Sequence, residues 1–88
     1  MKTKRFFTIA EIANMMKMLD IINKHENEWM EIFKDDQKMI EIEHRNCEEE
    51  RKKCVWIFDI FEIDVLLKAK NYYKGDKTIN GNEKIWIN

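Results

Sequence analysis

The fold is decided by residues 53–75, which read KCVWIFDIFEIDVLLKAKNYYKG. The apolar run at residues 54–58 is typical of a buried β-strand. Asp59 ends this run, and Asp59 and Glu62 have the spacing of a capping box, in which the N-cap carboxylate accepts from the backbone N–H three residues later. We therefore predict a strand that leads directly into a helix capped by Asp59.

The predicted helix is amphipathic. Its polar side carries Asp64, Lys68, Lys70 and Asn71, and its end is marked by Gly75, because glycine readily adopts the positive φ that often follows a helix. The apolar side carries Phe61, Val65, Leu66, Ala69, Tyr72 and Tyr73.

A similar arrangement occurs near the N-terminus. Thr8 and Glu11 repeat the capping-box spacing, and Phe7 with Ile12 can form the apolar staple that often flanks such a cap. We predict a short strand at residues 4–7, with a disordered tail as the alternative, and a helix from Thr8. The apolar periodicity lapses within residues 23–27, which predicts a bend, a stop or a solvated turn of a continuing helix. The inner side of this helix is predicted to carry Ile9, Ile12, Met16, Leu19 and either Ile22 or Asn23.

Two further strands are predicted from alternation. Ile40 and Ile42 alternate with Glu41 and Glu43, which favours a half-buried strand at residues 39–44, and residues 84–88 read as a final strand. The preferred architecture is therefore α+β, a ferredoxin-like split βαβ fold (βαββαβ) with two helices on one face of a small antiparallel sheet. The alternative is a mostly α fold, helical over residues 26–74, with a C-terminal β-hairpin about residues 80–81.

Composition bounds the cellular context. The chain has 88 residues, which predicts a single domain spanning residues 1–88, and 38% of them are charged although the net charge is only −1. It contains no run of about 20 apolar residues and no signal-peptide core, so we expect a cytoplasmic protein with reduced Cys47 and Cys54. Abundant Ile, Lys and Asn indicate an AT-rich gene, which favours a phage or mobile-element origin and hence a bacterial host cytoplasm.

The sequence offers few residues for catalysis or metal binding. His25, His44, Cys47 and Cys54 are possible ligands, but only His44 and Cys47 have a local ligand spacing, whereas a structural zinc site usually needs two such pairs. Two glycines in the whole chain exclude a glycine-rich phosphate loop. We therefore expect a protein that is not an enzyme and holds no metal or cofactor.

Segregated charge is the main functional signal. Residues 26–50 hold ten acidic side chains against Lys34, Lys38 and Arg45, and such a field attracts basic surfaces. We predict a protein-binding module that inhibits a host nucleic-acid-handling enzyme, as an anti-defence or anti-CRISPR protein does. A solvated face without a partner is the plain alternative. The predicted partner-binding residues are Glu28, Glu31, Asp35, Asp36, Glu41, Glu43, Glu48, Glu49 and Glu50.

The second functional hypothesis is a small RNA- or DNA-binding regulator. It would use Trp56 and Phe58 on the predicted sheet for base stacking, together with the lysines of residues 68–77. Residues 52–58 lack the glycine of the RNA-recognition signature, and core packing explains both aromatic residues more simply. No membrane partner is expected.

Overall fold

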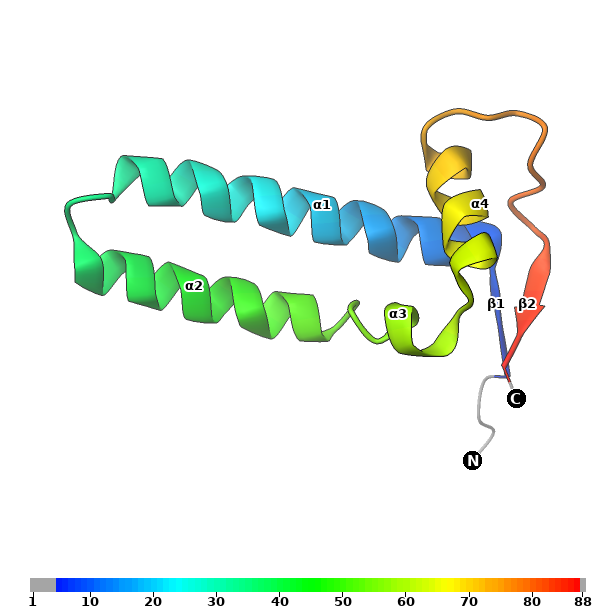
Figure 1. Ribbon diagram of the computed structural model, residues 1–88, viewed down its shortest axis with the longest axis horizontal. Helices are drawn as coiled ribbons and strands as arrows, with labels where there is room; N and C mark the ends of the chain where they lie inside the picture. The colour runs from blue at the N-terminus through cyan, green and yellow to red at the C-terminus, as the bar shows by residue number, and fades with distance from the viewer. Residues whose placement is uncertain (1–4, 88) are drawn as a thin grey trace.

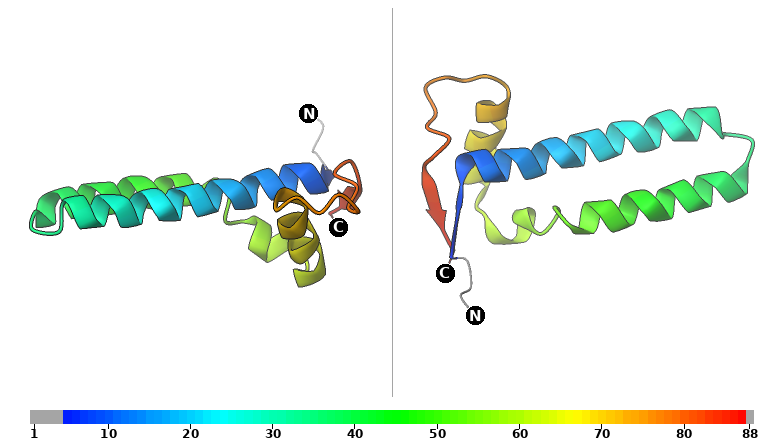
Figure 2. Two further views of the ribbon diagram at one scale, coloured as in Figure 1. Left: turned by 90° about the horizontal axis from the view of Figure 1, so that it is seen from above. Right: turned by 180° about the vertical axis from the view of Figure 1, so that it is seen from behind.

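The computed structural model describes residues 5–87, and most of them are helical (Figure 1). The elements in chain order are β1 (Phe6–Thr8), α1 (Ile9–Ile32), α2 (Gln37–Lys52), α3 (Ile57–Ile60), α4 (Ile63–Tyr73) and β2 (Lys84–Trp86). Helices α1 and α2 form a long antiparallel hairpin, and the remaining elements gather around the N-terminal end of α1 (Figure 2). The molecule is accordingly elongated and thin, with extents of 46 × 35 × 19 Å.

The preferred ferredoxin-like fold is wrong. Within residues 5–87 the sheet has two strands, β1 and β2, which pair antiparallel with Phe6 opposite Trp86 and Thr8 opposite Lys84. The mostly helical alternative fits the structure. It predicted a β-hairpin of two C-terminal strands, whereas in the structure the C-terminal strand β2 pairs with the N-terminal strand β1.

The strand predicted at residues 39–44 lies within α2. The alternation of Ile and Glu covers only four residues, whereas a helical spacing links Ile40, Cys47 and Cys54 over a longer span. Cys47 is buried and Ile40 and Cys54 are half-buried, while Ile42 is exposed. The longer period of about 3.6 residues therefore determines the structure.

The strand predicted at residues 54–58 is a turn followed by α3. Ile57 is fully buried and Phe61 nearly so, while Val55 and Phe58 are about half exposed. Helical turns bring Ile57 and Phe61 to one side, and the Trp56 indole closes the preceding turn by donating to the Lys53 carbonyl oxygen at 2.9 Å.

The capping box predicted at Asp59 is also wrong. Asp59 lies inside α3, Phe61 adopts an extended conformation after it, and α4 begins at Ile63 with Glu62 as an N-cap that makes no side-chain capping bond. The chain therefore enters α4 four residues after Asp59, and the N-terminal arrangement of cap and helix is not repeated at Asp59.

The N-terminal capping box is confirmed. The Thr8 hydroxyl oxygen accepts from the Glu11 backbone N–H at 3.2 Å, and the Glu11 carboxylate accepts from the Thr8 N–H at 3.0 Å. The next two N–H groups, of Ile9 and Ala10, donate to the carbonyl oxygens of Glu83 and Gly81 at 3.0 and 2.9 Å. The C-terminal segment thus satisfies first-turn donors that a helix cannot pair internally.

The core lies where α1, α3 and α4 meet. Ile9, Ile12 and Ile57 are fully buried there, and the aromatic rings of Phe7, Trp56 and Phe61 pack beside them. The predicted inner side of α1 is confirmed at Ile9, Ile12, Leu19 and Ile22, whereas Met16 is half-buried and Asn23 is exposed.

The predicted faces and end of α4 are confirmed. Ala69 is buried, the other predicted apolar positions are at least half-buried, and Asp64, Lys68, Lys70 and Asn71 are exposed. Gly75 has a φ of 104°, and the N–H groups of Gly75 and Asp76 donate to the carbonyl oxygens of Tyr72 and Asn71 at 3.1 and 3.0 Å. This pair of bonds is the Schellman motif that glycine permits.

Candidate functional site: the helical arm

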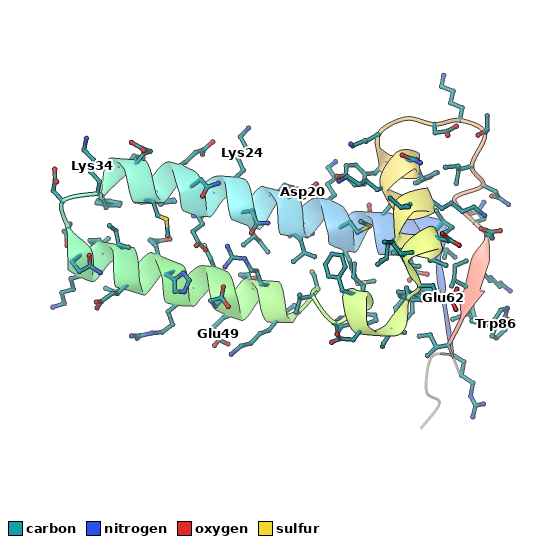
Figure 3. All side chains as sticks on the ribbon, viewed as in Figure 1. Asp20, Lys24, Lys34, Glu49, Glu62 and Trp86 are labelled. Carbon is teal, nitrogen blue, oxygen red and sulfur yellow. The ribbon has the colours of Figure 1, made fainter. Side chains whose placement is uncertain are left out.

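Beyond the core, α1 and α2 continue side by side as a two-helix arm, residues 22–52 (Figures 1 and 3). Lys24 stands along the outer edge of α1, Lys34 stands at the turn that follows α1, and Glu49 stands along the outer edge of α2 (Figure 3). The arm contains all the predicted partner-binding acids and three of the four potential metal ligands.

A buried glutamate holds the two helices of the arm together. Glu26 of α1 is only 8% exposed. Its carboxylate accepts from Arg51 Nη2 at 2.6 Å and contacts His44 Nδ1 at 3.3 Å, and Arg51 Nε donates to Asn23 Oδ1 at 2.9 Å. These bonds explain why α1 runs unbroken through the polar residues 23–27, where the sequence predicted a possible bend or stop.

The protonation of this cluster follows from its contacts. Burial alone would raise the pKa of Glu26, but hydrogen bonds with Arg51 and His44 and the charge of Arg51 outweigh burial and lower that pKa below 4.5. Burial raises the pKa of the Cys47 thiol, and the negative charge of Glu26 raises it further. Glu26 is therefore ionised and Cys47 protonated near neutral pH, so Cys47 lacks the thiolate character of a reactive cysteine.

Of the four possible metal ligands named from the sequence, His44 joins a cluster of potential donor atoms, together with two glutamates that the sequence did not single out. Ligand atoms of Glu26, His44 and Glu48 all lie within 4.8 Å of one another. Arg51 binds both carboxylates, Glu26 at 2.6 Å and Glu48 at 2.5 Å, so a fixed cation already neutralises one of their two negative charges. The contacts of Arg51 explain this cluster as an ion-pair network between the two helices. The expected absence of zinc stays a prediction.

His25 and Cys54 lie apart from that network. His25 Nε2 lies 3.6 Å from a Glu43 carboxylate oxygen, and its ring meets the edge of Trp29 with centroids 5.7 Å apart. Cys54 follows α2 and packs against the core. The sequence did not point to the pair of Glu26 and Arg51, because neither residue stands out among so many charged side chains.

About half of the predicted partner-binding acids are engaged within the chain. Asp36 caps α2 by accepting from the Met39 N–H at 3.1 Å, and Glu43 faces His25. The acids at residues 48–50, for which the sequence predicts a longer loop or a short helical turn, lie in α2. They pair with the cations three residues later, Arg51, Lys52 and Lys53, at 2.5, 3.3 and 3.0 Å. When these three cations are counted with the acidic segment, residues 26–53 hold ten acidic and six basic residues.

The other four acids lie toward the far end of the arm. Glu28 and Glu31 are exposed on the last turns of α1, Asp35 lies in the connecting turn, and Glu41 is exposed on α2. We call these four residues the acidic tip. The parallel rings of Trp29 and Phe33 stack beside them with centroids 4.7 Å apart.

The aromatic residues of the nucleic-acid hypothesis do not lie on a sheet. Trp56 is half-buried against Phe7, with ring centroids 5.2 Å apart, and Phe58 belongs to α3. The small sheet instead carries Trp86, which is 64% exposed and lies 5.1 Å from the Phe6 ring. The alternating sequence at residues 85–87 was the available signal for this exposed tryptophan.

No protein-family model, curated protein sequence or solved structure matches the chain. Within residues 5–87, none of the helices combines the length and the apolar character that crossing a membrane requires. The function therefore has to be argued from the geometry of this chain alone.

Proposed function

We propose that this protein is a non-catalytic binding module that docks its acidic tip on a basic surface of a partner protein. The surfaces of a cell that are most often basic are those that bind nucleic acid, so the partner class is a host nucleic-acid-handling enzyme and the role is inhibition. The observation that carries the proposal is the position of Glu28, Glu31, Asp35 and Glu41, exposed toward the end of an arm that projects from the core.

The arm can present these charges in a fixed arrangement. The Glu26–Arg51 pair ties α1 to α2 in its middle, and the Trp29–Phe33 stack stiffens its end. Charges held on a rigid support bind with a smaller loss of conformational freedom than charges on a flexible loop. A localised acidic surface also speeds encounter with a basic one, so the expected contribution is mainly to the association rate.

The reactive side chains of the arm support a non-catalytic role. Glu26, His44 and Arg51 are engaged with one another, and the raised pKa of Cys47 disfavours its thiolate. A general base or nucleophile would instead have to face a substrate. The same contacts have a sufficient explanation as inter-helix bonds.

The test compares two triple variants that change the charge equally. Glu31→Lys, Asp35→Lys and Glu41→Lys reverse the acidic tip, whereas Asp59→Lys, Glu62→Lys and Asp64→Lys reverse three exposed acids on α3 and α4. The partner is captured with the unmodified protein from a bacterial lysate, and association rates are then measured by surface plasmon resonance at two salt concentrations. We expect the tip variant to lower the association rate by about tenfold or more and the control to change it little. Equal losses in both variants, or no loss in either, would contradict the proposal.

One observation favours a second candidate function, binding of single-stranded nucleic acid. Exposed Trp86 lies beside Phe6, and Lys84 Nζ lies 4.9 Å from the centre of the Phe6 ring, which resembles a small stacking platform with a cation. Titration of a single-stranded RNA against the parent and Trp86→Ala separates the two functions. In this second case Trp86→Ala weakens RNA binding, and the tip reversal strengthens it by removing repulsion from phosphates.

A further inference from the structure

The α1–α2 hairpin has two broad faces that differ in polarity. One face holds a groove between the helices that is lined by the apolar side chains of Met18, Ile21, Ile22 and Cys47 and, at its edges, by the polar side chains of His25, Glu43, Asn46 and Glu50. Met18 and Ile21 are 46% and 49% exposed there. The other face carries the polar contact between Asn23 and Arg51. A two-helix layer that exposes several apolar side chains on one face is incomplete in water, and no element among residues 5–87 packs on that face.

The apolar face extends along the whole hairpin. Ile32 follows Ile21 by eleven residues, which is close to three helical turns, and it is 68% exposed. On α2, Ile42 precedes the groove residue Asn46 by one turn and is 39% exposed. Isolated exposed apolar residues are normal on a protein surface, but these share one face along the length of both helices.

The exposed area is larger than a compact chain of this mass needs. The chain exposes 6889 Å², whereas a compact monomer of 10.8 kDa exposes about 5,500 Å². Its radius of gyration is 15.9 Å, against about 12 Å for a compact domain of this length. The excess of about 1,400 Å² exceeds the roughly 800 Å² that each subunit buries in a standard interface.

Charge along α1 indicates what covers this face. An exposed stripe beside Ile21 carries Lys17 and Lys24 first, and Glu28 and Glu31 afterwards. These four residues follow spacings of seven, four and three, so they share one side of the helix. Two copies of this stripe therefore place opposite charges together when the helices run antiparallel. If the helices ran parallel, like charges would face each other.

We propose that a second copy of this chain covers the apolar face, so that two α1–α2 hairpins pack antiparallel as a four-helix bundle. A twofold axis near residues 21–24 brings the two Ile21 side chains together and places Lys17 of each copy opposite Glu28 of the other. This self-association does not depend on the proposed function. It can be measured on the purified protein alone. Of the acidic tip its second test changes only Glu28, whereas the docking test changes Glu31, Asp35 and Glu41, so the two proposals can fail separately.

The first test measures the oligomeric state of the full chain by sedimentation velocity from low to high micromolar concentration. The parent is expected to be a dimer, and Ile21→Glu is expected to raise the dimer dissociation constant by about tenfold or more. Met30→Glu is the matched control, because Met30 follows Ile21 by nine residues, half a helical rotation away, and is 37% exposed. A monomeric parent at the highest concentration, or equal effects of the two variants, would overturn the proposal.

The second test fixes the orientation and does not require any apolar substitution. Lys17→Glu and Glu28→Lys each oppose like charges across an antiparallel interface, so each is expected to raise the dimer dissociation constant several-fold at low salt. The double variant exchanges the charges and is expected to recover the parent value. If the double variant is weaker than both single variants, the antiparallel arrangement is wrong.

Discussion

The base of the molecule and its arm share α1 but are held together by different forces. At the base, Ile9, Ile12 and Ile57 are completely removed from water, and aromatic rings fill the space around them. In the arm, α1 and α2 are joined by the ion-pair network around the buried Glu26, beside the buried side chains of Ile22 and Cys47. Apolar burial is insensitive to pH, whereas a network of charged groups is not, so one chain should contain two parts that fail under different conditions.

The largest expected effect is a cavity in the base. Ile57→Ala removes a fully buried side chain from the core, and we expect it to lower the free energy of unfolding by about 3–4 kcal/mol. Chemical denaturation followed by circular dichroism measures this loss. Ile21→Ala, at a position that is 49% exposed, should cost less than about 1 kcal/mol in dilute solution. Similar losses at the two positions would show that the base is not the principal core.

The second effect concerns the arm. Glu26→Ala leaves Arg51 without its buried partner, which should destabilise the arm by about 2–3 kcal/mol. Amide hydrogen exchange should quicken in α2 and in the C-terminal half of α1, with little change in α4. Glu49→Ala is the control, because the pair of Glu49 with Lys52 is exposed and should contribute less than about 1 kcal/mol. Uniform exchange changes across both regions would mean that arm and base unfold as one unit.

The sequence predicted the parts of the base that depend on local signals. The Thr8–Glu11 capping box, the apolar side of α4 and the glycine at its end each involve residues a few positions apart, so local spacing was sufficient. The α2 half of the arm was mistaken for a strand and its connection because Ile40 and Ile42 alternate with glutamates over a short stretch. What makes that stretch helical is its pairing with α1, in which Glu26 meets a residue 25 positions away. No local pattern reports such a contact.

The sequence predicted where the acids of the candidate site lie, but not which of them pair with basic residues of the same chain. All nine acids named from the sequence lie in the arm, yet the acids at residues 48–50 are paired with the three cations that follow them. The pairing requires residues 48–53 to be helical, since only a helix brings side chains three apart together. Once the segment was taken as a loop, its charges could only be counted as exposed.

A third prediction uses pH to separate the two regions. The pKa of Glu26 in the folded chain is lower than its ordinary value of 4.5, so the folded state holds the ionised form more strongly than the unfolded state does. The stabilisation is therefore complete above pH 4.5 and is lost as pH falls through the lower, folded pKa. Exchange in α2 should quicken in acid before exchange in the core does, and Glu26→Gln should remove this difference. An acid response that is unchanged in Glu26→Gln would point to other carboxylates.

A smaller effect is expected at the two predicted helix caps, of which Thr8 forms one and Asp59 does not. Thr8→Ala removes the acceptor for the Glu11 N–H and should cost about 1 kcal/mol. Asp59→Ala alters an exposed residue inside α3 and should change stability by less than about 0.5 kcal/mol. Thermal unfolding midpoints of the two variants measure the difference. A larger loss for Asp59→Ala would restore the helix start that the sequence suggested.

The smallest expected effect is that of a chelator on the arm, where the donor atoms of Glu26, His44 and Glu48 converge. A divalent ion would have to displace Arg51, whose guanidinium is bonded to both carboxylates, and the guanidinium would then lose both of its carboxylate partners, which is costly. The purified protein should therefore contain no stoichiometric zinc by elemental analysis, and EDTA should leave its circular dichroism and the hydrogen exchange of α2 unchanged. Arg51→Ala removes the competing cation, so this variant should bind added zinc more tightly than the parent does. If the parent instead retains about one equivalent of zinc and its arm loosens on chelation, the arm is held by a metal and the ion-pair account of its stability is wrong.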